Sequence, residues 1–181
     1  MKTIQVPATG QVSAASQSIL EQVQKKMGQV PNLYATIGYS AQTLKGMLDF
    51  EATLAQGSSY TAKEREAINL IVSQVNNCTY CLAAHTMLAQ LKGFIKDETL
   101  DIRKGKAADS KLQTVILLAQ SIASNKGYAE ANLLENFFAA GYNESALIEL
   151  IALISIRTLT NYVYAATQII PVDFPLAEPL V

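Results

Sequence analysis

The amino-acid sequence predicts an all-α protein, and two features of its pattern carry that prediction. Apolar residues recur at three- and four-residue spacing, as in Ile68, Ile71, Val72 and Val75, which is the repeat of one helix face. Glycine and proline divide the chain into segments of helical length, with breaks at Pro7, Gly28–Pro31, Gly57, Gly93, Gly105, Gly127, Gly141 and Pro171. Because few segments alternate as strands do, we expect seven to nine helices with short connections and no sheet.

Three helices are predicted in the N-terminal part of the chain. Residues 13–27 form the first, and a turn at Pro31 leads into a short apolar helix that ends near Tyr39. The apolar face of the third helix consists of Leu44, Met47, Leu48 and Leu54.

A capping box marks the start of the next helix. In Thr61-Ala62-Lys63-Glu64 the threonine oxygen accepts a hydrogen bond from a terminal amide, and Glu64 reaches back to the cap. We expect this helix to run from about Ala62 to Val75.

Two asparagines then interrupt the pattern. Asn77 is a good N-cap, so a second helix is predicted from Cys78 to about Leu91, with Gly93 at its end. The alternative is a single bent helix that passes through Asn76 and Asn77.

The second half of the chain has a predicted helix with its apolar face at Val115, Leu118, Ala119 and Ile122. It also shows a faint repeat, since Tyr80–Thr86 matches Tyr162–Gln168 at an offset of 82 residues (80 to 162). Tyr60 and Tyr142 share the offset, and Thr160, Val163 and Thr167 stand where the first copy has Cys78, Cys81 and His85. Duplication and chance similarity both explain the match. We treat residues 1–181 as one domain, with one half at about 28–93 and a degenerate second repeat at about 110–171.

Composition limits the function classes. A net charge of −1 argues against a nucleic-acid-binding protein, which needs a basic surface. Only 16% of the residues are charged and 50% are hydrophobic, which leaves more apolar surface than one copy hides. We therefore expect a homo-oligomer.

The sequence predicts a cytoplasmic location. Met1–Gly10 has no apolar core of a secretory signal, and two cysteines are too few for the disulfide framework of a secreted protein. The longest apolar stretch, Leu147–Ile156, contains Glu149 and Ser155, so no membrane span is expected.

Both cysteines and the only histidine lie between Cys78 and His85. Positions i, i+3 and i+7 share one helix face, so the sulfurs of Cys78 and Cys81 can meet, and His85 follows Cys81 by one turn. Amides and the dipole at a helix N-terminus stabilise a thiolate, and histidine exchanges protons near neutral pH. The cluster predicts thiol chemistry assisted by proton transfer.

Three other interpretations compete with this one. Buried cysteines are often inert small apolar residues. Zinc would find three ligands on one helix, but the sequence offers no second Cys/His cluster to complete a tetrahedron. A purely structural disulfide would close a very small loop and add little stability.

Glu66 joins the cluster through the predicted hairpin. It precedes Asn76 by ten residues and His85 follows Asn76 by nine, so a fold-back at the asparagines would bring the two side chains face to face. The simpler explanation is an acidic residue favoured in the first turn of a helix.

These residues resemble a known family motif. The spacing of Glu66, Cys78-x-x-Cys81 and His85 within Lys63–Gly93 resembles the AhpD-like (alkylhydroperoxidase D-like) branch of the carboxymuconolactone decarboxylase superfamily. The upstream segment "GQVPNLYATIGYSAQTLKGML" is also similar, and the resemblance extends loosely from about Gly28 to Pro171.

The resemblance implies an all-α fold with a helical-hairpin repeat, assembled into trimers or hexamers. It also implies thiol-dependent peroxidase or disulfide-reductase chemistry with no permanently bound metal or organic cofactor. The active site would consist of Glu66, Cys78, Cys81 and His85. The substrate would be a hydroperoxide, and an external dithiol would act as reductant.

The chain departs from the best-known alkylhydroperoxidase D proteins at Tyr80. Those proteins have a second histidine between the cysteines, whereas a tyrosine, with an ordinary pKa of about 10, is a poor proton relay at neutral pH. The decarboxylase branch of the superfamily lacks the paired cysteines, so their presence favours redox chemistry.

The leading hypothesis is a thiol-dependent hydroperoxide reductase. One alternative is a disulfide reductase or electron carrier that serves a separate peroxidase. Another, from a different class, is a non-enzymatic helical oligomer whose thiols sense oxidation.

Within the leading hypothesis, Cys81 is expected to attack the peroxide and Cys78 to resolve the sulfenic acid. The dipole favours Cys78 by about 1 kcal/mol, but acid–base catalysis by the adjacent His85 favours Cys81 by about 3–5 kcal/mol. Cys78 should then be the outer sulfur, where an incoming dithiol attacks.

Overall fold

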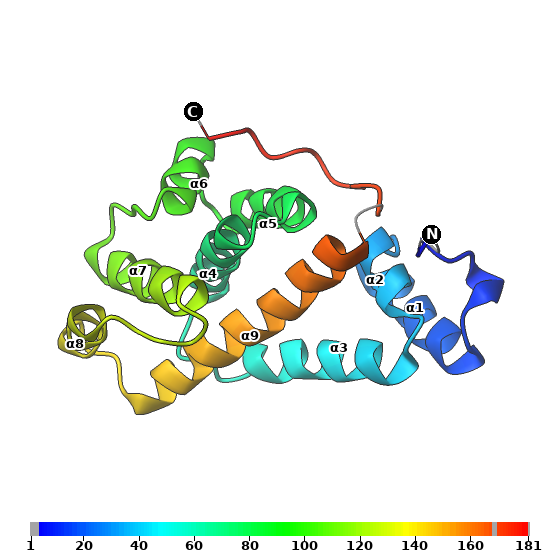
Figure 1. The fold of residues 1–181 in the computed structure, drawn as a ribbon, viewed down its shortest axis with the longest axis horizontal. Coiled ribbons are helices and arrows are strands. Elements are labelled where there is room, and N and C mark those ends of the chain that lie inside the picture. Colours follow the sequence, from blue (N-terminus) through cyan, green and yellow to red (C-terminus); the bar gives the residue numbers. More distant parts are fainter. Residues whose placement is uncertain (1–3, 168–169, 181) are drawn as a thin grey trace.

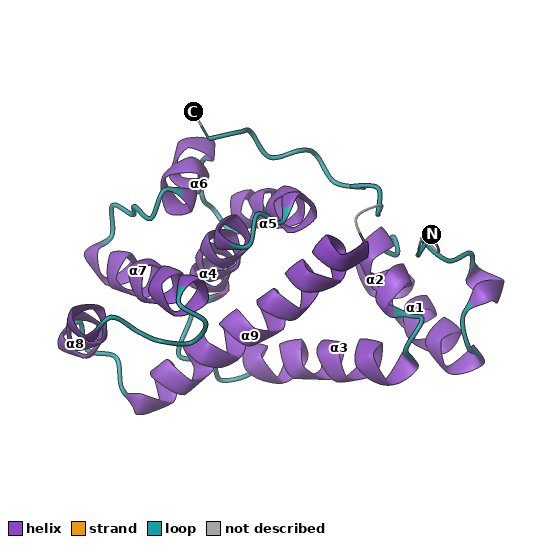
Figure 2. Cartoon of the chain, in the orientation of Figure 1, coloured by secondary structure: helices purple, strands orange, loops and turns teal. Residues whose placement is uncertain are grey.

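The computed structural model describes residues 4–167 and 170–180, and within these ranges every regular element is a helix (Figures 1 and 2). The prediction of an all-α fold with seven to nine helices is confirmed. The elements are a 3₁₀ turn η1 (Thr9–Gln11) and the helices α1 (Ala14–Met27), α2 (Asn32–Ile37), α3 (Ala41–Ala55), α4 (Ala62–Val75), α5 (Thr79–Leu91), α6 (Lys96–Arg103), α7 (Ser110–Ser124), α8 (Ala131–Ala139) and α9 (Glu144–Thr167).

Side-chain caps begin several of these helices where the sequence places Ser, Thr or Asp. The predicted capping box is present: Thr61 Oγ1 accepts from the Glu64 amide at 3.2 Å, and Glu64 Oε2 accepts from the Thr61 amide at 2.7 Å. The side chains of Ser13, Ser40 and Asp109 cap α1, α3 and α7, each by accepting a hydrogen bond from the amide three residues further on. These local contacts explain why the predicted helix starts agree closely with the structure.

The chain does fold back between α4 and α5, which excludes the single bent helix. Asn77 adopts φ 51°, a left-handed conformation that Asn tolerates better than most residues. The predicted cap is wrong by one residue: Cys78, not Asn77, is the N-cap of α5. Because Asn77 is occupied in reversing the chain, the next residue takes the extended conformation that a cap requires.

The second copy of the faint repeat does not form a hairpin. Residues 144–167 are one continuous helix, α9, which runs diagonally across the molecule and packs against α2, α3, α4, α5 and α7 (Figure 1). The expected helical-hairpin repeat is therefore present only in its first copy. Tyr60 and Tyr142, which share the offset, lie together in the core with ring centroids 5.7 Å apart.

Helix α9 is also long and apolar enough to cross a membrane by length and composition. It packs on five other helices, however, and buries Arg157, Thr160 and Asn161 among them. These contacts make it a core helix of the folded domain, and the structure offers no support for a membrane location.

The core has two apolar clusters, with α5 between them. The larger cluster joins α4, α6, α7 and α8 to the first half of α9. The smaller one joins α2 and α3 to both cysteines, Tyr80, Ile156 and Ile170. The described C-terminal residues 170–180, which we call the C-terminal strap, run without helix from the end of α2 to α6 (Figure 1). The strap closes one side of the smaller cluster.

Candidate active site

The hairpin brings Glu66 of α4 and His85 of α5 together. Glu66 Oε2 lies 2.6 Å from His85 Nδ1, and both side chains are largely buried, so the contact predicted from the residue count is confirmed. Burial alone would raise the pKa of Glu66, but His85, Arg157 and a hydrogen bond from Asn69 hold it below its ordinary value of 4.5. An ionised Glu66 can only accept a hydrogen bond, so Nδ1 of His85 carries the proton that it donates to the carboxylate. Nε2 of His85 is then the nitrogen that can exchange protons with the site.

The two cysteines are reduced thiols within hydrogen-bond reach of each other. Cys78 Sγ accepts from the Cys81 amide at 3.3 Å and caps α5. The Cys78 thiol donates to the Cys81 sulfur and, with the positive charges of Arg157 and His85, lowers the pKa of Cys81 to about 6 against the cost of burial. Donating that hydrogen bond, together with burial, raises the pKa of Cys78. Near neutral pH the arrangement favours a thiolate on Cys81 and a thiol on Cys78.

Cys78 is not the outer sulfur. Its residue is 1% exposed and that of Cys81 is 2% exposed, and a small hollow reaches Cys81 but not Cys78. The expectation is wrong because Cys78 serves as the helix cap, which turns its sulfur inward toward the amides of α5.

Arg157 of α9 completes the site, and sequence reasoning missed it. Its guanidinium donates to Asn69 at 3.1 Å, to Thr160 at 3.1 Å and to Glu51 at 3.3 Å. Thr160 Oγ1 in turn lies 3.9 Å from Cys81 Sγ. A lone arginine directly after the apolar stretch Leu147–Ile156 was the available sequence signal, because a cation there must be paired when buried.

Asn161 was also missed. Its side chain accepts from Asn76 Nδ2 at 2.9 Å and, by a hydrogen bond, helps to lower the pKa of Cys81. α9 thus touches the site with three polar side chains that lie within little more than one helical turn, although none of them stands in the predicted motif.

The Tyr80 hydroxyl bonds to groups outside the Glu66–His85 pair. It donates to the Asp173 carboxylate of the C-terminal strap and accepts from the Leu33 amide at 3.2 Å. Burial and the hydrogen bond to Asp173 raise the pKa of Tyr80. Tyr80 therefore links α5 to α2 and to the C-terminal strap, and its hydroxyl stays protonated near neutral pH.

Two hollows lie on either side of His85. A hollow of about 70 Å³ touches Cys81, and one of about 190 Å³ touches Glu66. Tyr34, His85, Leu88 and Arg157 line both hollows and form the wall between them. The imidazole is thus placed to pass a proton between the sulfur side and the carboxylate side.

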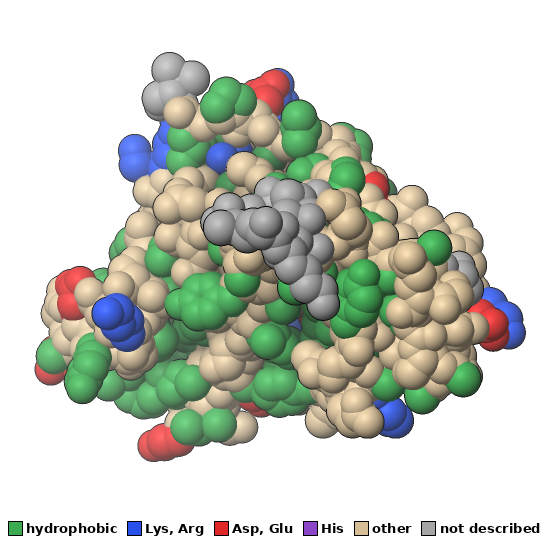
Figure 3. Space-filling model, turned by 45° about the vertical axis from the view of Figure 1, so that its right-hand side comes forward, with side chains coloured by type: hydrophobic (Ala, Val, Ile, Leu, Met, Phe, Trp, Pro, Cys, Tyr) green, Lys and Arg blue, Asp and Glu red, His purple; other side chains and the backbone are tan. Residues whose placement is uncertain are grey.

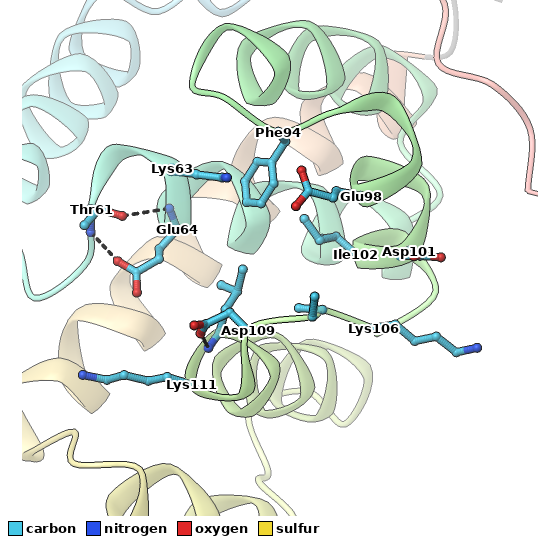
Figure 4. A pocket seen from close by; sticks show the side chains of 13 residues that line it. Thr61, Lys63, Glu64, Phe94, Glu98, Asp101, Ile102, Lys106, Asp109 and Lys111 are labelled. Carbon is cyan, nitrogen blue, oxygen red and sulfur yellow. Dashed lines mark hydrogen bonds between the residues drawn. The ribbon is translucent and has the colours of Figure 1, made fainter.

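A larger hollow of about 390 Å³ lies between α4, α6 and α7, remote from the sulfurs (Figure 4). Several of its charged side chains already have structural partners. Glu64 and Asp109 cap helices, and the Lys63 ammonium lies 4.2 Å from the centre of the Phe94 ring. We therefore place the chemistry at the cysteines rather than in the larger space. Within the described ranges, no three His, Cys, Asp or Glu side chains gather as metal ligands.

Comparison with known proteins agrees with this geometry. The sequence model of the carboxymuconolactone decarboxylase family matches residues 41–110, a segment that includes Glu66, Cys78, Cys81 and His85. The chain is thus similar to the carboxymuconolactone decarboxylase family over this segment, and its fold is AhpD-like. Arg157 and Thr160 lie outside the matched segment, so the family match alone does not point to them.

Solved structures share the AhpD-like fold over nearly the whole chain. An uncharacterised peroxidase-related protein from Silicibacter sp. TM1040 has a TM-score of 0.79 at 24% identity, covering 93% of this chain and 91% of its own. An alkylhydroperoxidase AhpD core protein from Ralstonia eutropha JMP134 has a TM-score of 0.81 at 19% identity, covering 93% and 90%.

A third similar structure has a different activity. A cysteine-to-alanine variant of the debrominase Bmp8, in complex with 2,3,4-tribromopyrrole, has a TM-score of 0.79 at 14% identity, covering 96% of this chain and 92% of its own. No curated protein matches the sequence. At these identities the structural similarity shows a shared fold.

Proposed function

We propose that this protein is a thiol-dependent hydroperoxide reductase in which Cys81 is the attacking thiolate and Cys78 the resolving thiol. The observation that carries the proposal is the shared environment of Cys81. The Cys78 thiol, the buried Arg157 guanidinium and His85, which is paired with Glu66, together lower the pKa of this sulfur to about 6. Such surroundings are typical of reactive rather than inert cysteines.

The proposed reaction has three steps. The Cys81 thiolate attacks the terminal oxygen of the hydroperoxide, the O–O bond breaks, and the departing oxygen takes a proton from His85 Nε2 to leave as alcohol or water. The Cys78 sulfur then attacks the Cys81 sulfenic acid, and the S–O bond breaks with release of water. An external dithiol reduces the resulting disulfide and becomes a disulfide itself.

Arg157 serves this reaction without contacting the sulfur. It is buried and stays charged, because Glu51, Cys81 and Glu66 offset the cost of its burial. Its charge stabilises the Cys81 thiolate, and its hydrogen bond orients the Thr160 hydroxyl that faces the same sulfur. We assign Arg157 as a positioning and electrostatic residue.

The debrominase Bmp8 supports a second candidate, removal of halogen from a brominated aromatic ring. The aromatic side chains of Tyr34, Tyr80 and Phe174 line the hollow at Cys81, which suits an aromatic substrate. Its volume of about 70 Å³ favours a smaller molecule, so peroxide reduction stands first.

A single assay separates the candidate functions. Purified protein is mixed with hydrogen peroxide and dithiothreitol, and both peroxide and thiol are measured with time. Consumption of both supports a reductase, while thiol exchange with an added disulfide but no peroxide loss supports an electron carrier. If neither changes, the thiols act as a sensor or are structural. Bromide release from 2,3,4-tribromopyrrole in a parallel reaction would favour the second candidate.

We also propose that the protein is a cytoplasmic homo-oligomer, a trimer or hexamer, without a permanently bound cofactor. Ile148, Ile151, Leu159 and Tyr162 are exposed on one face of α9, and apolar side chains form several patches on the face of the molecule shown in Figure 3. Their spacing places them within one narrow stripe that a second copy could cover. We expect light scattering to give a mass that is a multiple of 19.6 kDa, and Ile151→Lys to shift it toward 19.6 kDa. A wild-type monomer at micromolar concentration would contradict the proposal.

A further inference from the structure

The C-terminal strap forms part of the wall of the hollow at Cys81. Phe174 of the strap packs edge-on against Tyr80, with ring centroids 5.6 Å apart at 90°. Both rings line the hollow that also contains Cys81 and His85. The remaining walls at this end come from Pro31 and other apolar residues, so the two rings face the sulfur across a small apolar space.

Asp173 fixes this part of the strap in place. One carboxylate oxygen accepts from the Tyr80 hydroxyl, and the other accepts from the Asn32 amide at 2.9 Å. Asn32 also donates from its side chain to the Pro171 carbonyl at 3.0 Å. The C-terminal strap, α2 and α5 are therefore joined by one hydrogen-bond network next to Phe174.

The far end of the strap is held as well. Glu178 forms an ion pair with Lys96 at 2.6 Å, and its backbone carbonyl accepts from Arg103 at 2.6 Å. Because both ends are anchored, Phe174 is held against the hollow by more than its own packing.

The hollow at Cys81 is small. Its volume of about 70 Å³ is about half that of an apolar cavity of about 150 Å³, which is large enough to hold benzene. A phenyl group or a long alkyl chain therefore exceeds the space beside Cys81, whereas hydrogen peroxide does not.

We propose that Phe174 and Tyr80, held by Asp173, determine specificity by limiting access to Cys81 to small hydroperoxides such as hydrogen peroxide. This inference rests on the proposed function and deepens it, since it names the substrate class. It also assigns a role to Tyr80, which replaces the second histidine of the best-known alkylhydroperoxidase D proteins. At this position the tyrosine closes a cavity instead of moving a proton.

The test compares Phe174→Ala with Leu176→Ala, an exposed position on the same strap. Hydrogen peroxide and cumene hydroperoxide are the two substrates, with dithiothreitol as reductant. We expect Phe174→Ala to raise kcat/KM for cumene hydroperoxide by about tenfold or more and to change that for hydrogen peroxide by less than about threefold. Leu176→Ala should behave as wild type. An unchanged substrate ratio in Phe174→Ala would overturn the inference.

Asp173→Asn provides a second route, because it weakens the anchor and leaves the cavity wall intact. It should shift the substrate ratio in the same direction but less than Phe174→Ala. Thermal denaturation of all variants identifies any that fail to fold. If one of Phe174→Ala and Asp173→Asn does not fold, the substrate ratio of the other tests the inference.

A measurement that needs no peroxide turnover separates this inference from the proposed function. In Cys78→Ser protein, Cys81 is alkylated by iodoacetamide, which is small, and by N-benzylmaleimide, which is bulky. Adding Phe174→Ala should raise the bulky-to-small rate ratio by about tenfold. If the ratio rises while no variant consumes peroxide, the access role holds and the reductase proposal fails. If the ratio stays constant, the access role is wrong whether or not peroxide is consumed.

Discussion

The hairpin of α4 and α5 and the single helix α9 are two outcomes of similar sequence at an 82-residue offset (80 to 162). Asn77 reverses the chain in the first segment with φ 51°, whereas Leu159 stands at the matching position of α9 and the helix continues through it. A branched apolar side chain is strained in the left-handed region that Asn tolerates. The residue at this position is therefore one difference that favours a turn in the first segment and a continuous helix in the second.

The difference assigns different tasks to the two segments. The turn brings Glu66 and His85 to 2.6 Å, although a straight helix would hold residues 19 apart at about 28 Å. α9 lacks the cysteines and the histidine but provides Arg157, Thr160 and Asn161, which surround them. The hairpin carries the reacting groups, and the straight helix provides their electrostatic environment.

Removing a reacting group from the hairpin should have the largest effect. Cys81→Ser should lower peroxide consumption by more than about 10³-fold, because the attacking thiolate is lost. Cys78→Ser should still form a sulfenic acid on Cys81 that dimedone traps. Mass spectrometry locates the label, and labelling of Cys78 in the Cys81→Ser protein at an equal rate would show that the environment does not select the nucleophile.

Breaking the contact that the turn creates should have the next largest effect. Glu66→Gln removes the carboxylate that holds Nδ1 of His85, so kcat/KM for hydrogen peroxide at pH 7 should fall by about 10²-fold while the fold persists. Circular dichroism checks the fold. Wild-type turnover in this variant would remove Glu66 from the relay.

The same substitution should alter the pH dependence of stability. The pKa of Glu66 lies below its ordinary value of 4.5 in the folded state, so its contribution to stability is present above about pH 4.5 and is lost as the pH falls further. Urea unfolding at pH 7 and pH 3 should therefore differ less for Glu66→Gln than for wild type. Equal pH dependence in the two proteins would contradict the ion pair.

Changing the contribution of α9 should affect the thiol without removing it. Wild-type Cys81 should be alkylated fastest above about pH 6, because the thiolate predominates above its pKa. Arg157→Met should shift this profile to higher pH and lower the free energy of unfolding by about 3 kcal/mol, since Glu51 loses its cationic partner. Arg157→Lys, which keeps the charge, should shift the profile less. Identical profiles in all three proteins would rule out an electrostatic role for Arg157.

Making the turn resemble α9 should have the smallest effect. Asn77→Leu places the residue found at position 159 in a left-handed conformation, at a cost of about 1–2 kcal/mol in the free energy of unfolding. Asn77→Gly, which adopts that conformation readily, should stay within about 0.5 kcal/mol of wild type. Chemical denaturation measures both, and an equal loss for the two variants would show that the backbone conformation is not what distinguishes the segments.

Interactions between residues close in sequence made the helix starts and part of the candidate site predictable. The capping box at Thr61 and Glu64 depends on residues three positions apart, and the Glu66–His85 contact followed from counting outward from the asparagines. The position of Arg157 did not follow, because its partners Glu51 and Asn69 are 106 and 88 residues away in sequence. The link between Tyr80 and Asp173 spans 93 residues and was beyond the same reasoning. Contacts fixed by tertiary packing leave little trace in one sequence.

The unequal protonation of the two cysteines has a consequence for electron transfer. Between about pH 6 and the higher pKa of Cys78, reduction of a disulfide between them would take up two electrons and only one proton, because Cys81 stays a thiolate. The midpoint potential should then fall by about 30 mV per pH unit, half the slope of an ordinary two-proton dithiol. Toward acidic pH the slope should double. The potential of the pair would therefore vary less with pH than that of an ordinary dithiol donor, so the donor's driving force for reducing the pair would grow by about 30 mV for each unit rise in pH.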